Sequence, residues 1–301
     1  MKKLNLFISI IATLFILSSC DNNDEATPQE SPLASYHQMT EQTLSNTGLT
    51  LNLRSGEADL FAGYNKFFAE LTDADGNQVT NAEVKLMPMM DMVMGEMTHS
   101  HAAPVDQPTL MEEGFFKGGI NFIMPSTGET GVWTLHVTVS ANDMTDEIML
   151  PITVSDKNLT YASGQDNAQY QTIIRKEVDG TRYFVAYYFV EDKPMVGSNE
   201  IVITVHKMMP MDTMEGMEME HNGFMPVNDL TVEFQPWMPS MGHGSSNNVN
   251  PIALGDGHYK GTVNFNMTGD WELKLKVMDG EKVLLNSMAE DATDASFYLE
   301  F

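Results

Sequence analysis

The chain contains the same pattern of residues twice, and this duplication constrains its fold more than any other feature. In each copy, a segment bounded by two glycines leads into an apolar segment, and a glycine and a tryptophan follow. The matching positions are 63–65 with 197–199, 84–88 with 232–236, 114–118 with 257–261, 120–124 with 263–267, Gly131 with Gly269 and Trp133 with Trp271. A repeat of this length indicates two domains in tandem. At roughly 100 to 140 residues each, both are large enough to bury their own core.

Hydrophobic residues alternate with polar ones along both copies, for example at 132–139 and 271–277, and Gly, Asp and Asn interrupt the pattern. This period of two is typical of antiparallel strands with one buried face. No long helical period appears. We therefore predict an all-β protein made of two tandem immunoglobulin-like β-sandwich domains, with Trp133 and Trp271 in the two cores.

The domain boundaries follow from changes in composition. We expect the first sandwich at 49–156 and the second at 157–301. Residues 20–48 are rich in Asn, Ser, Thr, Pro and Gln, which predicts a flexible tether in which residues 36–44 could form a short helix.

The first residues carry an export signal. Lysines at positions 2 and 3, an apolar run at 6–17 and the sequence Leu-Ser-Ser-Cys at 17–20 indicate a signal peptide over residues 1–19; an uncleaved anchor is the alternative. The Leu-Ser-Ser-Cys sequence at 17–20 resembles the lipobox of bacterial lipoproteins, which implies acylation of Cys20 and attachment to a membrane. Residues 21–25 resemble the surface-export signal of Bacteroidetes lipoproteins, although acidic tethers are also simply soluble. We expect a cell-envelope protein, an outer membrane lipoprotein that is periplasmic or surface-exposed.

Cys20 is the only cysteine, so acylation would leave no thiol for a disulfide or a metal. The chain has 42 Asp and Glu against 16 Lys and Arg. This acidic excess argues against a nucleic-acid partner, because phosphate contacts need a cationic surface. It is compatible with a cationic ligand.

Methionine is the most unusual component, at 25 residues, and most of these residues fall in three clusters that also contain histidines. The candidate metal ligands of the first cluster are Met90, Met92, Met97, His99 and His101. Those of the second are His206, Met208, Met209, Met211, Met214, Met217, Met219 and His221. Those of the third are Met238, Met241 and His243, with His258 further along.

Methionine can also be a flexible filler of hydrophobic cores, and the first cluster could simply pack along one strand face. The second cluster is interleaved with Asp and Glu, a composition that does not bury. We therefore expect its thioethers to be exposed in a long loop, which favours a ligand for them.

Thioether sulfur selects Cu(I), and imidazole binds copper in either oxidation state, so copper is the predicted cofactor, with Cu(I) favoured and Cu(II) possible. Zinc prefers Cys, His and carboxylate. Met238, Met241 and His243 form the best-defined candidate site; alternatively, Met238 belongs to the core. His258 occupies the position of Phe115 in the first copy, so it is either an added ligand or an aromatic packing equivalent.

The segments 238–244, 248–251, 257–261 and 267–271 together resemble the YtkA-like domain family of bacterial extracytoplasmic proteins, related to FixH-type proteins. The resemblance covers most of 195–301 and, more loosely, 60–155. It implies a β-sandwich and a role in copper handling or cytochrome oxidase assembly. In both copies a Met-rich turn ends in Met-x-His, which pairs Met97 and His99 with Met241 and His243. The first copy departs from the Met-Pro-x-Met-x-His motif, since its methionines are spread over a longer stretch before His99.

The chain shows no arrangement typical of a nucleophilic enzyme and no phosphate-binding loop, so we predict a non-enzyme. The leading hypothesis is a copper-binding lipoprotein that buffers or passes copper, with 206–225 as a capture arm. Its expected partners are the membrane, through the lipid on Cys20, and a copper chaperone, copper exporter or oxidase assembly factor. Alternatives are an adhesive or structural surface lipoprotein without metal, and an oxidant sink in which methionine forms sulfoxide. We expect the second copy to be the metal site and the first to be mainly scaffold.

Overall fold

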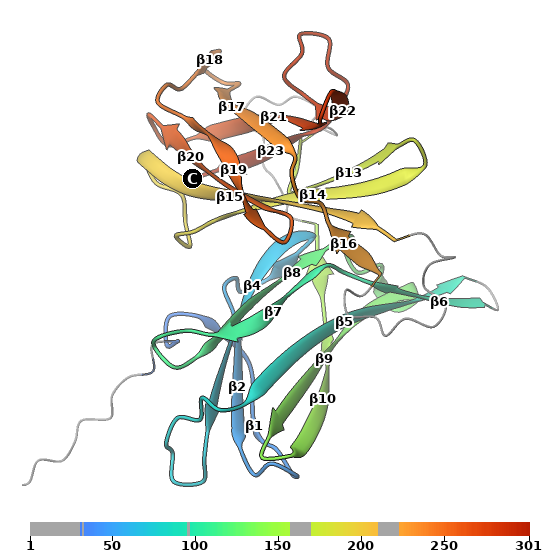
Figure 1. Ribbon diagram of the computed structural model, residues 1–301, viewed down its shortest axis with the longest axis vertical. Coiled ribbons are helices and arrows are strands. Elements are labelled where there is room, and N and C mark those ends of the chain that lie inside the picture. Colours follow the sequence, from blue (N-terminus) through green and yellow to red (C-terminus); the bar gives the residue numbers. More distant parts are fainter. Residues whose placement is uncertain (1–30, 32, 95–96, 157–169, 210–222) are drawn as a thin grey trace, which may run out of the picture. The chain divides into compact units, whose positions relative to one another are not determined.

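The computed structural model describes residues 31, 33–94, 97–156, 170–209 and 223–301 (Figure 1). In these residues every regular element is a β-strand, apart from one 3-10 turn at Gly128–Thr130. Residues 33–301 form one compact unit. The prediction of an all-β fold with tandem sandwiches is confirmed. None of the described segments is a helix with the length and apolarity needed to cross a membrane.

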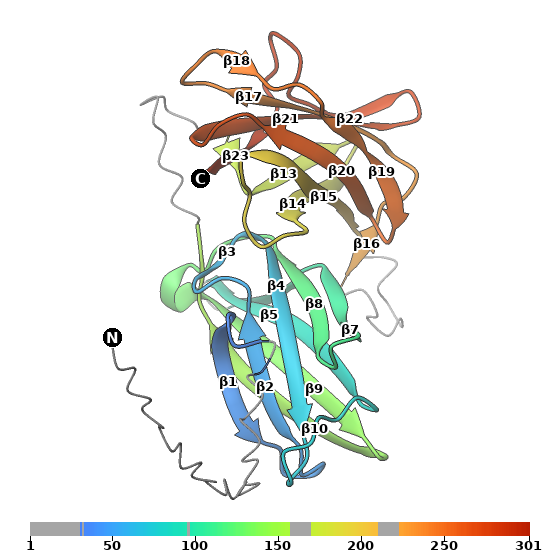
Figure 2. The ribbon, with the colours of Figure 1, turned by 90° about the vertical axis from the view of Figure 1, so that its left-hand side faces the viewer.

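The first sandwich consists of two antiparallel sheets (Figure 2). One sheet has the order β1-β2-β4-β8-β7, with strands His37–Thr43, Thr50–Ser55, Gly63–Thr72, Phe116–Phe122 and Val105–Leu110. The other has the order β10-β9-β5-β6, with strands Met144–Ile152, Gly131–Ala141, Glu83–Met94 and Met97–Ala102. The short strands β3 (Leu60–Phe61) and β11 (Val154–Ser155) pair in parallel.

The second sandwich repeats this plan. Its first sheet has the order β13-β14-β15-β20-β19, with strands Ile173–Val178, Thr181–Phe189, Gly197–Met208, His258–Phe265 and Val249–Gly255, and β16 (Phe224–Pro226) also pairs with β15. Its second sheet has the order β12-β23-β21-β17-β18, with strands Tyr170–Gln171, Ser296–Glu300, Asp270–Asp279, Thr231–Met238 and His243–Gly244, and β22 (Lys282–Asn286) also pairs with β21.

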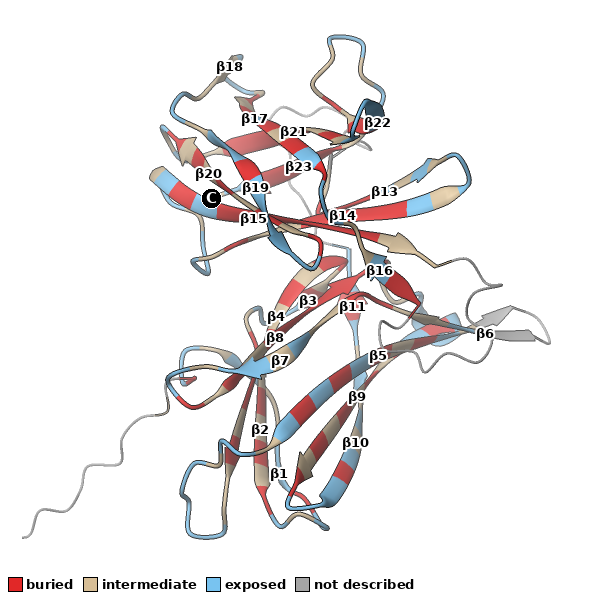
Figure 3. Cartoon of the chain, in the orientation of Figure 1, coloured by how far each residue is buried: buried red, intermediate tan, exposed pale blue. Residues whose placement is uncertain are grey.

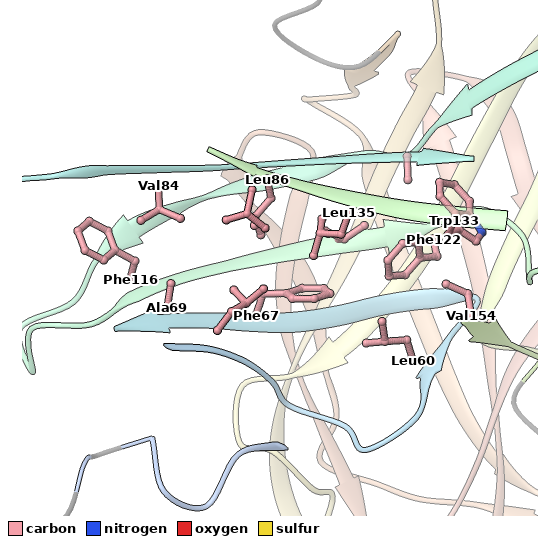
Figure 4. Close-up of a cluster of buried hydrophobic side chains, with 14 of the residues drawn as sticks. Leu60, Phe67, Ala69, Val84, Leu86, Phe116, Phe122, Trp133, Leu135 and Val154 are labelled. Carbon is pink, nitrogen blue, oxygen red and sulfur yellow. The ribbon is translucent and has the colours of Figure 1, made fainter. Parts of the chain in front are cut away.

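The core lies between the two sheets of each sandwich, because alternate residues of each strand point inward. Buried and less buried positions alternate along β5, β9 and β17 (Figure 3). Trp133 packs edge-on against Phe122 with ring centroids 5.2 Å apart (Figure 4). Trp271 lies against Phe265 in the second core at 5.0 Å. Both tryptophans are fully buried, as predicted.

The duplication seen in the sequence extends to individual hydrogen bonds. Asn65 and Asn199 occupy equivalent positions on β4 and β15, opposite Ile120 and Val263. Each donates from Nδ2 to the carbonyl two residues earlier, at 2.9 Å, and each side-chain oxygen accepts from the backbone N–H four residues earlier. These buried amides therefore fix the same strand entry in both copies.

The prediction of a tether over 20–48 is wrong at its C-terminal end, and the short helix expected at 36–44 is instead strand β1. Leu33 and Leu44, on either side of β1, are buried. The strand lies at the edge of its sheet and keeps most of its polar side chains in solvent, so its composition resembles that of a linker. The signal peptide and Cys20 lie outside the described residues.

Candidate metal centre

A row of three side chains crosses one end of the first sandwich. Met90 on β5 lies opposite Trp133 on β9 and, on its other side, opposite His101 on β6. Residues directly opposite one another in an antiparallel ladder share a face of the sheet. Trp133 and Met90 are fully buried, and His101 is half-buried. The row therefore runs from the core toward the surface.

The second sandwich contains the same row. Met238 on β17 lies opposite His243 on β18. On the other side β17 pairs with β21, with Trp237 opposite Glu272, and continuing this register by one residue brings Met238 opposite Trp271. Trp271 and Met238 are buried, and His243 is half-buried. Both sandwiches thus place a core Trp, a core Met and a His in one line.

The glycine that precedes each tryptophan makes room for the methionine of the row. A Cβ atom added to Gly131 would lie 2.7 Å from Cε of Met90, and one added to Gly269 would lie 3.1 Å from Cε of Met238. Gly131 also lies close to Thr127, and Gly269 has a φ of +131°, so the duplicated Gly-x-Trp pattern serves the local backbone as well as the packing of the two methionines.

Each row has a second methionine beside it. The indole N–H of Trp133 donates to the carbonyl of Met124 at 3.1 Å, and that of Trp271 donates to the carbonyl of Met267 at 3.2 Å. Both methionines are half-buried and pack against their cores. Sequence reasoning missed them as donors, although they close the matching segments 120–124 and 263–267.

His243 has a nitrogen available for a ligand. Its Nδ1 lies 2.9 Å from the carbonyl oxygen of Gly244, so Nδ1 carries the proton and Nε2 keeps its lone pair. Its ring lies 6.5 Å from that of Trp271. Met241 is 60% exposed in the turn between β17 and β18, whereas Met238 is 1% exposed. The third cluster therefore divides as the alternative interpretation predicted, with Met238 in the core.

The register also changes the alignment of the two copies. The sequence pairs His99 with His243, but the residue opposite the buried methionine in the first sandwich is His101. His99 lies opposite Met92, further out on a longer hairpin, and Met97 lies opposite Met94. Met92 is half-buried and packs against the core. The side chains of residues 93–99 are outside the described part.

Most of the second cluster also lies outside the described residues, including Met211, Met214, Met217, Met219 and His221. Met209 follows β15, and its N–H donates to the carbonyl of Gly223 at 2.9 Å. Met208 ends β15 and packs against a hydrophobic cluster that joins the core of the first sandwich to Phe184 and Phe224 of the second.

His258 is not part of the third cluster. It begins β20, while Phe265, which contacts Trp271, ends the same strand. Seven residues of strand separate the two ends by roughly 24 Å. The structure therefore does not bring His258 to Met238, Met241 and His243.

His258 instead binds a carboxylate of the first sandwich. Its Nε2 lies 2.9 Å from Oδ2 of Asp106, and its Nδ1 lies 2.8 Å from the carbonyl oxygen of Asp256. Burial lowers the pKa of His258, but the hydrogen bond and charge of Asp106 outweigh burial and raise it. Conversely, burial raises the pKa of Asp106, while the bonds from His258 and Tyr64 bring it below its usual value. Both ring nitrogens face oxygen acceptors, an arrangement that favours the imidazolium form of His258 over a neutral ring with a lone pair for a metal.

His206 lies near the pair formed by His258 and Asp106. It is buried on β15, its ring lies 6.4 Å from that of His258, and both histidines line a cavity of about 740 Å³ together with Asp106. Within the described ranges, no three His, Cys, Asp or Glu side chains gather closely enough to hold a metal ion. A metal at the rows would therefore need thioether donors.

The fold and the rows define the class of protein: an all-β chain of duplicated sandwiches with paired methionine and histidine side chains. Residues 180–276 match the family model described as YtkA-like. The second sandwich is a YtkA-like domain, and the looser resemblance of residues 60–155 stays a prediction.

Solved structures with similar chains include the Escherichia coli adhesin FdeC, at 15% identity and a TM-score of 0.24, covering 87% of this chain and 65% of the adhesin. Invasin, a bacterial integrin-binding protein, matches at 10% identity and a TM-score of 0.24, over 84% of this chain and 39% of its own. Domains 5–6 of the S-layer protein SbsC match at 10% identity and a TM-score of 0.25, over 86% of this chain and 97% of the SbsC chain. The chain thus spans less than two thirds of the adhesin and of invasin. A comparison with curated proteins found no match.

Proposed function

We propose that the protein is a copper-binding lipoprotein of the cell envelope, without enzymatic activity, that buffers copper or passes it to a partner. The site in the second sandwich consists of His243 and Met241, with buried Met238 opposite His243 and with Met267, whose carbonyl binds Trp271, as a further candidate donor. Acylated Cys20 holds the protein at the membrane, and a copper chaperone, exporter or oxidase assembly factor exchanges copper with it.

The observation that carries this proposal is the repetition of the row in both sandwiches. Packing alone requires an apolar side chain at Met90 and Met238, and leucine would meet that need. It does not require a histidine directly opposite each of them. The coincidence of thioether and imidazole at the same register position in both copies favours a shared ligand.

The donor chemistry favours Cu(I). Thioether and neutral imidazole donors suit a soft monovalent ion, and they need no deprotonation. The Nδ1–H bond of His243 to Gly244 fixes the tautomer that leaves Nε2 as the ligand. The buried indole of Trp271 has its ring 6.5 Å from the imidazole, close enough for its fluorescence to report an ion bound by His243.

An anaerobic Cu(I) titration tests the proposal. The mature chain should carry Cys20→Ser, because this removes the only thiol. We expect His243→Ala combined with Met241→Leu to lose at least one equivalent of tight binding and the associated quenching of tryptophan fluorescence. Met195→Leu, a substitution of a methionine that is 57% exposed outside the rows, is the matched control and should bind as the parent does. An unchanged titration of the double variant would contradict the site, and a parent that binds no copper would favour a surface module without metal.

A further inference from the structure

We propose a second soft-metal site, in which His101, Met124 and Met208 bind a monovalent soft cation at the end of the first row. The inference rests on the proposed function only for the identity of the metal as copper. The three residues belong to different parts of the chain: His101 is near the end of β6, Met124 follows β8, and Met208 ends β15.

These three side chains line one cavity of about 310 Å³. All three are half-buried, and both methionines pack against the hydrophobic cluster that joins the core of the first sandwich to Phe184 and Phe224. Ile123, Tyr183 and Phe184 form much of the remaining wall. The apolar part of this wall partly shields a bound ion from water, which strengthens its interaction with the few donors present.

Two of the proposed donors, His101 and Met124, belong to the first sandwich, and the third, Met208, comes from β15 of the second. His101 lies opposite buried Met90, and Met124 accepts the indole hydrogen bond of Trp133 through its carbonyl. Met208 supplies a further thioether. In the second sandwich the corresponding outer thioether is Met241, which comes from the neighbouring turn. The first and second clusters therefore meet at a place that neither suggests alone.

The charges around the cavity disfavour a divalent cation more strongly than a monovalent one. Arg175, Lys176 and Arg182 line it, and Glu177 is its one acidic residue among the described residues. Glu177 accepts from Arg182 at 3.3 Å, and Lys176 pairs with Asp294. Basic groups repel a divalent cation more strongly than a monovalent one, and no unengaged carboxylate offers a hard ligand. The site should therefore take Cu(I) or Ag(I) in preference to Cu(II) or Zn²⁺.

The site has a structural consequence, because its ligands come from both sandwiches. A cation bound by His101, Met124 and Met208 joins β6 and the end of β8 to β15. Binding to the folded chain alone raises its stability with the concentration of free ligand. We therefore expect occupation of this site to raise the melting temperature of the entire unit 33–301.

Silver(I) serves as the probe, since it is a redox-inert soft cation. In the Cys20→Ser chain, Met124→Leu with Met208→Leu keeps the apolar volume and removes both thioethers. We expect one equivalent fewer of tightly bound Ag(I), at least a tenfold weaker affinity at this site and a smaller rise in melting temperature. His101→Gln should give the same loss, and Met195→Leu should not.

The outcomes distinguish this inference from the proposed function. If the His243 and Met241 variant loses silver but the Met124 and Met208 variant binds as the parent does, the inter-sandwich site is wrong and the proposed function stands. The opposite pattern supports this site and contradicts the one in the second sandwich. If the parent binds no silver at either place, both are wrong. Equal affinity for Zn²⁺ and Ag(I) at the Met124 and Met208 site would also overturn the inference.

Discussion

The two sandwiches share a buried framework and differ in what surrounds it. Both place Trp, Met and His in one row, and both use a glycine to accommodate the methionine. In the first sandwich a long hairpin, β5–β6, places His101 at a partly enclosed cavity that Met208 also lines. In the second, a short turn leaves Met241 in solvent. The residues that both copies share therefore maintain the packing of the core. The connections that differ between the copies, the β5–β6 hairpin and the β17–β18 turn, determine how exposed each row is to solvent.

The two copies differ less in their expected roles than the sequence predicts. The sequence predicts a metal site in the second copy and a scaffold in the first. The structure gives both copies the same row, and the first has an additional thioether from β15. The two rows are therefore better compared as a partly enclosed site and an exposed site.

The largest expected effect on the shared framework is the loss of stability on removal of its tryptophans. We expect Trp133→Ala and Trp271→Ala each to lower the free energy of unfolding by about 3–5 kcal/mol, because each leaves a large cavity in a close-packed core. Urea denaturation measures this. If one substitution costs much less than the other, the two cores are not equivalent.

The second test concerns a position at which the copies differ, Phe115 against His258. We expect His258→Gln to destabilise the protein by about 1.5–3 kcal/mol in mildly acidic solution, because it removes a hydrogen-bonded charge pair with Asp106.

The sign of the pH dependence follows from the two pKa directions. The raised pKa of His258 gives stability that is complete below its unfolded value, about 6.5, and is lost as pH rises through the folded value. The lowered pKa of Asp106 gives stability that is present above its unfolded value and is lost as pH falls through the folded one. Denaturation of parent and variant across pH 5–9 measures the first effect. The same pH dependence in both chains would show that His258 is not its source.

The smallest expected effect separates packing from ligation at the buried methionines. Met90→Leu and Met238→Leu should each cost less than about 1.5 kcal/mol of stability, because leucine nearly conserves the volume. If the buried thioethers also ligate copper, each substitution should weaken Cu(I) binding in its own sandwich only. Full retention of affinity would assign Met90 and Met238 to packing alone.

The sequence by itself determined the duplication, the all-β class and the burial of Trp133 and Trp271, because these depend on local patterns such as alternation, glycine spacing and aromatic position. It did not identify β1, since an exposed edge strand has the composition of a linker. It also paired His99 with His243, because motif spacing does not reveal how many residues a hairpin inserts.

Only the tertiary structure decided which residues meet. Asp106 and His258 stand 152 positions apart, and Met208 and His101 belong to different clusters. The hydrogen bonds that tie Met124 to Trp133 and Met267 to Trp271 are likewise visible only in the structure. Strand register depends on turn geometry and hairpin length as well as on alternation. The packing of one sandwich against the other arises from contacts between segments that are distant in the sequence, so the alternation alone does not specify which residues meet.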